Sequence, residues 1–244
     1  MRAVDEAKRV VHASLRRFGY DIVRTADPFA RLVRLLAEHR VELALDVGAN
    51  DGAYARALRA AGYRGRICSF EPLSEAFQRL QSAAAADPRW ECRPLALGPA
   101  PAVAELNVAG NSSSSSLLAM TERHLRGAPE SAFVDTETVE VAPLDSLRGT
   151  LWRPGERLFL KLDVQGYELS VLEGARATLG DVRVLQVELS LVPLYEGQAL
   201  MPELADRLRR AGFVLVALDS VFTDPRTAEL LQLDGLFARP SANG

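Results

Sequence analysis

The sequence predicts one α/β domain built on a mainly parallel sheet that helices cover on both faces. From Val41 onward, short apolar runs alternate with amphipathic segments of about 10 to 15 residues, a pattern typical of this class. At 244 residues and 48% hydrophobic content, the chain can bury one substantial core and has little room for a second domain. We therefore expect an N-terminal helical cap over residues 1–40 and the main domain over residues 41–240.

The apolar and amphipathic runs give the expected order of elements. In the cap, apolar residues three and four apart predict helices over residues 7–19 and 27–40, with Asp27 as N-cap and Pro28 in the first turn. In the main domain, the expected sheet strands are residues 42–48, 66–70, 91–97, 157–164, 182–189 and 212–220, and the expected helices are residues 52–62, 73–86, 167–180 and 201–212.

Charge and composition narrow the partners and the compartment. The formal net charge is −3, which gives no sign of a clustered basic surface, so we expect no nucleic-acid partner. Cys68 and Cys92 lie in apolar strands, as buried thiols of a reducing compartment do. No apolar run reaches about 18 residues, and the N-terminus lacks the apolar stretch of a signal peptide. We expect a cytoplasmic protein without a membrane partner.

The stretch LALDVGANDGAYARAL places Gly48 and Gly52 between an apolar strand and a helix. Bare backbone at such a turn lets a ligand approach closely. The spacing is not the G-x-G-x-x-G of dinucleotide sites, and Asp51 would repel a diphosphate, so an NAD-dependent oxidoreductase is disfavoured. Asp46 and the loop amides around Asn50 instead suit a ligand end with an ammonium and a carboxylate, such as S-adenosylmethionine. The alternative is that the glycines serve packing only.

A second acidic residue favours a nucleoside ligand. Glu71 ends the next apolar strand, about 20 residues past the glycines, where a carboxylate can accept both hydroxyls of a ribose. Ala96 and Leu97, at a third strand end, would lie beside the adenine. Alternatively, Glu71 is only an acid near the start of the helix that follows Pro72.

At this point the chain resembles the FkbM-type methyltransferases. The resemblance implies a class I methyltransferase with a Rossmann-like sheet, S-adenosylmethionine as methyl donor, and O-methylation of a small molecule or sugar. Tyr54 and Ser115, which lie in the matching blocks, complete the expected cofactor contacts. The family commonly reads K-x-D-V-E-G-x-E where this chain has Gln165 at the first glutamate position. The matching blocks are LDVGANDGAYARAL, SFEPLSEAFQRL, PLALG, SSSSSL, APLDSL, LFLKLDVQGYELSVLEGA and QVELSLVPLY, in this order.

Candidate catalytic residues follow two neighbouring strands. Period-2 alternation sends Lys161, Asp163 and Gln165 to one face at the end of a buried strand, and Glu188 ends the next apolar strand. Lys161 is one of only two lysines in the chain, and a lysine in an apolar strand is costly unless paired. It either forms an ion pair with Asp163 or Glu188, or it orients the substrate and handles a proton.

A general base and a metal ion are two further hypotheses. Methyl transfer to an oxygen gains from a base that takes the hydroxyl proton, and His124 is the only histidine in the central part of the chain. The sequence nevertheless favours a solvated helix residue at His124. Asp163 and Glu188 could instead hold a divalent cation such as magnesium, which would acidify the hydroxyl.

Two extra strands, at residues 99–108 and 136–143, interrupt the alternation, and five consecutive serines lie between them. The serine run is either a flexible linker or an ordered loop over the site. If it is ordered, we expect a lid that ligand binding stabilises.

The favoured function is transfer of a methyl group from S-adenosylmethionine to a hydroxyl of a small molecule, a sugar or secondary metabolite. The alternative is a non-catalytic protein that binds the same nucleoside and has a regulatory role. No segment encodes the identity of the acceptor, and the oligomeric state stays open, a homo-oligomer included.

Overall fold

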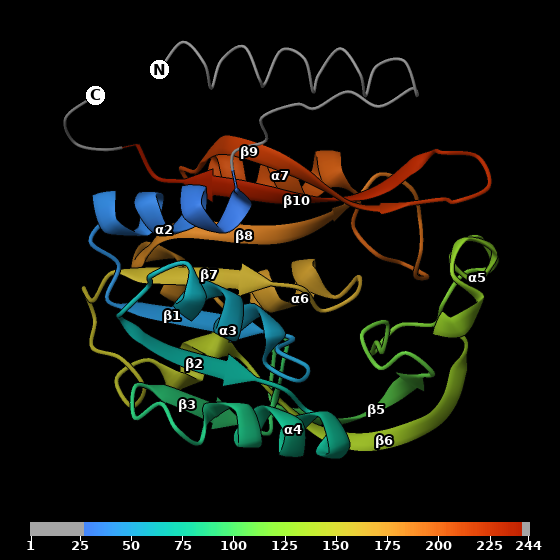
Figure 1. Ribbon diagram of the computed structural model, residues 1–244, viewed down its shortest axis with the longest axis horizontal. Helices are drawn as coiled ribbons and strands as arrows, with labels where there is room; N and C mark the ends of the chain where they lie inside the picture. The colour runs from blue at the N-terminus through green and yellow to red at the C-terminus, as the bar shows by residue number, and fades with distance from the viewer. Residues whose placement is uncertain (1–26, 241–244) are drawn as a thin grey trace, which may run out of the picture.

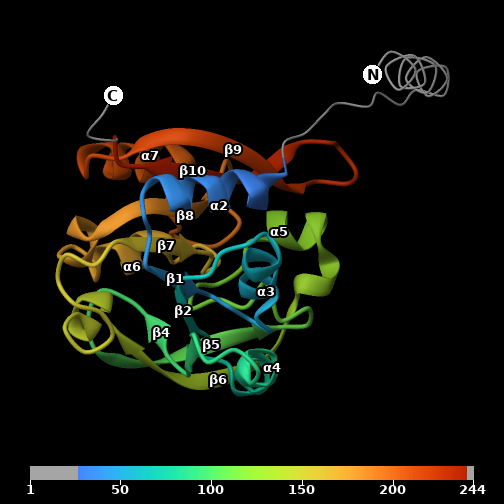
Figure 2. The same cartoon turned by 60° about the vertical axis from the view of Figure 1, so that its left-hand side comes forward.

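The protein, seen here as a computed structural model that describes residues 27–240, is built around one seven-stranded sheet with helices on both faces (Figures 1 and 2). The strand order is β3-β2-β1-β7-β8-β10-β9. β10 runs antiparallel to both of its neighbours, and the other strand pairs are parallel. The sheet is mainly parallel, as the sequence predicts. The strands are β1 (Leu43–Val47), β2 (Arg66–Phe70), β3 (Trp90–Arg93), β7 (Leu158–Leu162), β8 (Val182–Ser190), β9 (Val214–Thr223) and β10 (Leu230–Ala238).

Helices pack on the two faces of the sheet through separate clusters of buried side chains. On one face, α2 contributes Leu32 and Leu36 to a cluster that also holds residues of α3 and α4. On the other face, α6 and α7 pack on a larger cluster that includes Val171 and Leu204. The helices are α2 (Pro28–Glu38), α3 (Ala53–Ala60), α4 (Ser74–Ala84), α5 (Glu122–Gly127), α6 (Glu168–Glu173) and α7 (Met201–Arg210), and short 3-10 helices span Pro129–Ser131, Leu144–Leu147 and Thr178–Gly180.

The start of α2 agrees with the sequence prediction. The side chain of Asp27 accepts a hydrogen bond from the backbone N–H of Phe29 at 3.0 Å, and proline follows it in the first turn. The other helix expected in the cap, over residues 7–19, lies outside the described residues.

A second, three-stranded sheet lies beside the first. It has the order β4-β6-β5 and consists of β4 (Ala96–Leu97), β5 (Ala102–Ala109) and β6 (Phe133–Ala142). The two extra strands predicted from the sequence are therefore present as β5 and β6. Residues 91–97, expected as one strand, are divided between the two sheets. Pro94 explains the break, because it lacks the N–H that would continue the β3 ladder.

Two further expectations about the elements were wrong. No strand was expected over residues 230–238, where β10 lies; its Gln232, Asp234 and Gly235 interrupt the apolar pattern although the strand is largely buried between β8 and β9. The helix expected over residues 167–180 ends at Gly174. A Cβ at Gly174 would lie 2.0 Å from the carbonyl oxygen of Gly98, so the chain turns there to pack backbone against backbone.

The carboxyl ends of β1, β2, β7 and β8 meet at one edge of the main sheet. In Figure 1 this edge faces α5 and the loop between β5 and α5. In open α/β sheets, ligands bind at this edge. Cys68 on β2 is buried and Cys92 on β3 is half-buried, and both thiols are free. Among residues 27–240, no helix is long and apolar enough to cross a membrane.

Candidate active site

A first cavity lies at the ends of β1, β2 and β7, beneath the serine run. One end is polar and carries Gly48, Asn50 and Glu71, and the serines cover the cavity. The apolar part of its wall suits a flat ring. That part of the wall is formed by Phe70, Leu95, Ala96, Leu97, Leu106 and Leu117.

Glu71 is the buried acid of this cavity. Its Oε2 accepts a hydrogen bond from the N–H of Asn50 at 2.8 Å, and its Oε1 accepts one from the N–H of Leu73 at 2.9 Å. Burial raises the pKa of Glu71, although these two backbone hydrogen bonds act to lower it. Each carboxylate oxygen keeps a further lone pair, so the side chain can accept hydroxyl groups from the cavity.

The two glycines of the turn have different roles. Gly48, with a φ of +76°, lines the cavity, and a Cβ there would lie 1.8 Å from the carbonyl oxygen of Asp163. Gly52, with a φ of +80°, does not line it, and its Cβ would press against Leu80 and Trp90 at 2.9 Å. Gly48 therefore lets the turn pack on the end of β7 beside the ligand space, whereas Gly52 serves packing.

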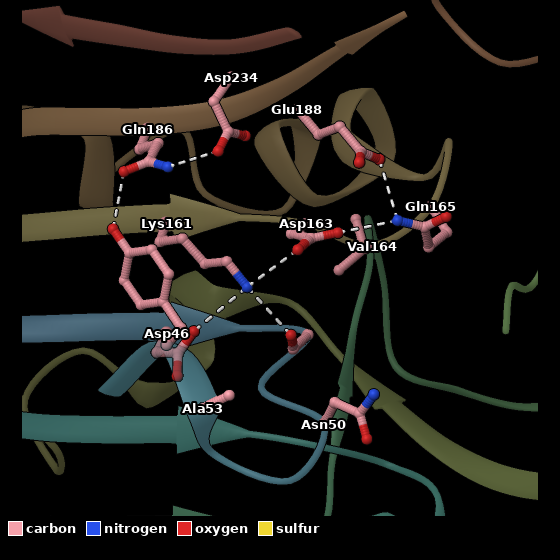
Figure 3. A network of polar contacts seen from close by, with 12 residues as sticks. Asp46, Asn50, Ala53, Lys161, Asp163, Val164, Gln165, Gln186, Glu188 and Asp234 are labelled. Atoms are coloured by element: carbon pink, nitrogen blue, oxygen red, sulfur yellow. Dashed lines mark hydrogen bonds and ion pairs between the residues drawn. The ribbon is translucent and has the colours of Figure 1, made fainter. Parts of the chain in front are cut away.

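Lys161 is a buried cation tied to the glycine turn (Figure 3). Its Nζ donates to the carbonyl oxygen of Gly48 at 3.0 Å and lies 3.4 Å from Asp46 Oδ1 and 3.3 Å from Asp163 Oδ2. Burial acts to lower the pKa of Lys161, but Asp163 and Asp46 outweigh it and hold the pKa above its usual value. The expected ion pair with Asp163 is present. The alternative pair with Glu188 does not form, and Asp46 is the second partner.

Two of the expected cofactor contacts, Asp46 and Tyr54, lie away from the first cavity. The strand register explains the place of Asp46, which lies directly beside Lys161 on the neighbouring strand and accepts a hydrogen bond from Ser69 at 3.0 Å. The hydroxyl of Tyr54 donates to Gln186 Oε1 at 2.7 Å, and its ring lies 5.1 Å from the Lys161 ammonium. Both residues support the buried lysine.

The serine run is an ordered loop, not a linker. Ser112 Oγ accepts a hydrogen bond from Asn50 Nδ2 at 3.3 Å, and Ser115 Oγ accepts one from the N–H of Ala109 at 2.9 Å. Ser116 Oγ donates to the backbone oxygen of Gln165 at 2.7 Å. These three serines line the first cavity, so the loop covers it and is fastened to the turn after β1 and to the segment after β7.

A second cavity, of about 310 Å³, adjoins the first. The two share Ser113, Asp163 and Gln165 as a common wall. The second cavity is also lined by His124 of α5 and Glu188 of β8. Three of the four candidate catalytic residues, Asp163, His124 and Glu188, therefore line one cavity although they come from separate parts of the sequence.

Gln165, which was not among the site residues expected from the sequence, holds the common wall in place. Its Nε2 donates to Asp163 Oδ1 at 2.9 Å and to Glu188 Oε2 at 3.0 Å, as Figure 3 shows. Its Oε1 accepts from the hydroxyl of Tyr195 at 2.8 Å, and the same hydroxyl lies 2.9 Å from the backbone oxygen of Ser114. The only sequence signal for this role was the amide at a position where the family commonly has glutamate.

Glu188 is buried beside other acids. Burial raises the pKa of Glu188 well above its usual value, and Asp163 and Glu168 raise it further. The carboxyl group therefore keeps its proton to a higher pH than an exposed glutamate does.

His124 is not the solvated helix residue that the sequence favoured. Its exposed fraction is 3%, and its ring packs against Tyr195 and Phe222 at centroid distances of 5.1 and 5.7 Å. Nδ1 is buried and has no hydrogen-bond partner among residues 27–240. Burial lowers the pKa of His124, which favours the neutral imidazole. The sequence pattern does not show this burial because α5 is short and its partners are distant in the chain: Tyr195 lies in the loop after β8, and Phe222 lies on β9.

The magnesium hypothesis finds no ready-made ligand set. In the part of the chain that the structure describes, no group of three or more histidine, cysteine, aspartate or glutamate side chains is arranged to hold a metal ion. Asp163 and Glu188, the two expected ligands, are bridged by the Gln165 amide.

This fold and site define a class I methyltransferase. The chain belongs to the FkbM methyltransferase family: the model of the methyltransferase FkbM domain matches residues 46–215. Enzymes of this family use S-adenosylmethionine, and the chain is accordingly an S-adenosylmethionine-dependent methyltransferase. A search of curated proteins gave no match.

A structure search finds similarity to solved structures of methyltransferases at low sequence identity. An rRNA methylase from Streptococcus thermophilus is 11% identical with a TM-score of 0.49, over 90% of this chain and 100% of that one. A precorrin-6y C5,15-methyltransferase from Geobacter metallireducens is 13% identical with a TM-score of 0.44, over 88% and 93%. The 23S rRNA methyltransferase ErmE is 10% identical with a TM-score of 0.45, over 91% and 70%.

The residues of the first cavity fit S-adenosylmethionine. Glu71 offers free acceptor positions to the ribose hydroxyls, and the apolar wall with Ala96 and Leu97 suits adenine. Gly48 and Asn50 line the same cavity and would lie beside the methionine end. Of the expected cofactor residues, six line this cavity, namely Gly48, Asn50, Glu71, Ala96, Leu97 and Ser115.

Proposed function

We propose that the protein methylates a hydroxyl group of a small molecule, a sugar or secondary metabolite, that binds in the second cavity. The observation that carries the proposal is the common wall of Ser113, Asp163 and Gln165. A donor in the first cavity and an acceptor in the second would meet at this wall. Positioning of this kind supplies much of the rate of a methyl transfer.

The residues of the first cavity bind the donor, and those of the second bind the acceptor. When bound, S-adenosylmethionine supplies an electrophilic methyl group. Glu71 and the turn from Gly48 to Asn50 hold the donor, and Gln165 keeps Asp163 and Glu188 in place at the wall. His124 and Glu188 orient the acceptor hydroxyl, and one of them takes its proton. Lys161 acts on the site only by fixing Gly48, Asp46 and Asp163.

A non-catalytic binding protein is the competing function. The buried His124 and Glu188 argue against it, because a pocket that only binds the nucleoside has no need of polar side chains in a neighbouring cavity. The contrast can be tested without knowing the natural acceptor.

The experiment is a methyl-transfer assay with labelled donor and a panel of acceptors that includes sugars, other hydroxylated metabolites and RNA. Under the proposal, label moves to a hydroxyl compound, and His124→Gln or Glu188→Gln lowers turnover about a hundredfold or more while leaving the affinity for S-adenosylhomocysteine within about threefold. Glu140→Gln, at an exposed residue of β6, is the matched control. Transfer to RNA alone, or full activity in both variants, contradicts the proposal.

A further inference from the structure

The charged side chains that line the second cavity are nearly all acidic. Glu130, Asp163 and Glu188 contribute carboxylates, and neither lysine nor arginine is among the described lining residues. His124 is the only basic side chain there, and its lowered pKa favours the uncharged form.

Two of these carboxylates lack a cationic partner. Asp163 is paired with Lys161 at 3.3 Å. Within residues 27–240, Glu130 and Glu188 take part in no ion pair, and Glu188 has only the neutral amide of Gln165 as a hydrogen-bond partner. Asp234 lies opposite Glu188 on the neighbouring strand, and burial together with Asp163 raises its pKa to about 6. The raised pKa of Glu188 lets this carboxyl keep its proton, so the β8 side of the cavity offers hydrogen-bonding oxygens but no positive charge.

The rest of the lining is neutral and rich in hydrogen-bonding groups. Asn111, Ser114 and Ser131 form a small network in which Asn111 Nδ2 donates to both serine hydroxyls at 3.0 Å. Gln232 lies on β10, and the ring of Phe222 gives one apolar surface. Such a lining offers donors and acceptors to hydroxyl groups but no counter-ion to an anion.

We infer that the second cavity selects its acceptor by charge: it takes an uncharged or cationic hydroxyl compound and rejects one with a phosphate or carboxylate close to the reacting hydroxyl. An anion there would lie beside the carboxylates of Asp163 and Glu130, with no lysine or arginine among the described lining residues to pair with it. An ammonium group there would instead gain a carboxylate partner. The inference rests on the proposed function, because it assigns the second cavity to the acceptor.

The test uses three sugars of similar size and different charge: methyl glucoside, glucosamine and glucose 6-phosphate. Each is titrated by NMR into the full chain saturated with S-adenosylhomocysteine, and the imidazole signal of His124 is followed. The chain has only three histidines, so His124→Gln assigns the signal, and the signal of His39 is an internal control. We expect methyl glucoside and glucosamine to shift the His124 signal, and glucose 6-phosphate to bind at least about tenfold more weakly.

In the double variant Glu130→Gln/Glu188→Gln, the ratio of the dissociation constants of glucose 6-phosphate and methyl glucoside should fall at least about threefold. Glu140→Gln should leave this ratio unchanged. Three outcomes would overturn the inference. They are binding of glucose 6-phosphate as tight as that of methyl glucoside or tighter, an unchanged affinity ratio in the double variant, and no response of the His124 signal to any of the three sugars. Failure of this inference can be told apart from failure of the proposed function. Transfer of labelled methyl to an anionic hydroxyl compound overturns the charge selection alone, and charge-selective binding with no transfer to any hydroxyl overturns the proposed reaction alone.

Discussion

The ammonium nitrogen of Lys161 lies 3.0 Å from the carbonyl oxygen of Gly48, so the end of β7 is joined directly to the glycine turn after β1. Asp46 and Asp163 complete the surroundings of the ammonium, and Lys161 lines neither cavity. The lysine is therefore a structural cation that shapes the donor turn. Of the two hypotheses drawn from the sequence, the geometry favours the ion pair over proton handling.

Lys161→Met should destabilise the fold. It leaves Asp46, which is 2% exposed, without its cation, and a buried charge that loses its partner costs about 3–5 kcal/mol. Chemical denaturation should show a loss of this size in the free energy of unfolding. Arg34→Met, which breaks an exposed pair with Glu38, should change it by less than about 1 kcal/mol. A Lys161→Met protein of normal stability would contradict the structural role.

Glu168 should make stability fall as the pH rises toward neutrality. Its Oε1 accepts hydrogen bonds from the N–H groups of Val164 and Gly166, and burial raises its pKa from 4.5 to about 7. The folded state holds this proton more tightly than the unfolded chain does. The contribution of Glu168 to the free energy of unfolding is therefore complete below pH 4.5 and is lost as the pH rises through about 7.

The variant Glu168→Gln keeps an oxygen for both hydrogen bonds and removes the titration. Across that pH window, its free energy of unfolding should decline less than that of the parent, by up to about 3 kcal/mol. Glu173→Gln, at an exposed residue of the same helix, is the control. Parallel pH profiles for Glu168→Gln and the parent protein would refute the assignment.

Glu71 should control donor affinity. Glu71→Gln replaces a charged acceptor of the ribose hydroxyls by a neutral amide, and hydrogen bonds to charged groups contribute about 1.5–3 kcal/mol each. Calorimetry should show at least about a tenfold loss of affinity for S-adenosylhomocysteine. Glu75→Gln, at an exposed residue in the first turn of α4, should bind normally. Unchanged affinity in Glu71→Gln would remove Glu71 from the site.

The serine loop should become more protected when the donor product binds. Ser112, Ser115 and Ser116 line the first cavity, so a ligand there adds contacts to a loop that already has hydrogen bonds to the domain. Hydrogen exchange over residues 110–128 should slow with S-adenosylhomocysteine, while the hairpin at residues 223–229 exchanges as before. Unaltered exchange in the serine loop would mean that it is not a lid.

Much of the fold could be predicted because the signal is local. The parallel strands are apolar runs, and glycine or proline marks the turns between them, so β1, β2, β7 and β8 were found within a few residues. β10 was missed because the half-buried Asp234 and the buried Gln232 have hydrogen bonds to Gln186 and Ser190, which only the pairing of distant strands creates. A polar residue with such a partner has no separate signal in the sequence.

In the site, too, residues that belong to local features could be predicted, and those that depend on contacts between distant segments could not. Glu71 and Gly48 were found because a strand end and a glycine turn are local features. The surroundings of Tyr54, His124 and Gln165 depend on contacts across 132, 71 and 23 positions of the chain, with Gln186, Tyr195 and Glu188 respectively. Periodicity cannot report such contacts, so the buried position of His124 and the amide bridge of Gln165 emerge only in three dimensions.

The most direct test of the central claim is a crystal structure of the protein with S-adenosylhomocysteine. The account expects the ribose hydroxyls within hydrogen-bond distance of the Glu71 carboxylate, and the sulfur at the wall of Asp163 and Gln165, on the side that faces His124 and Glu188. A nucleoside bound away from Glu71, or a sulfur that faces away from the second cavity, would contradict it.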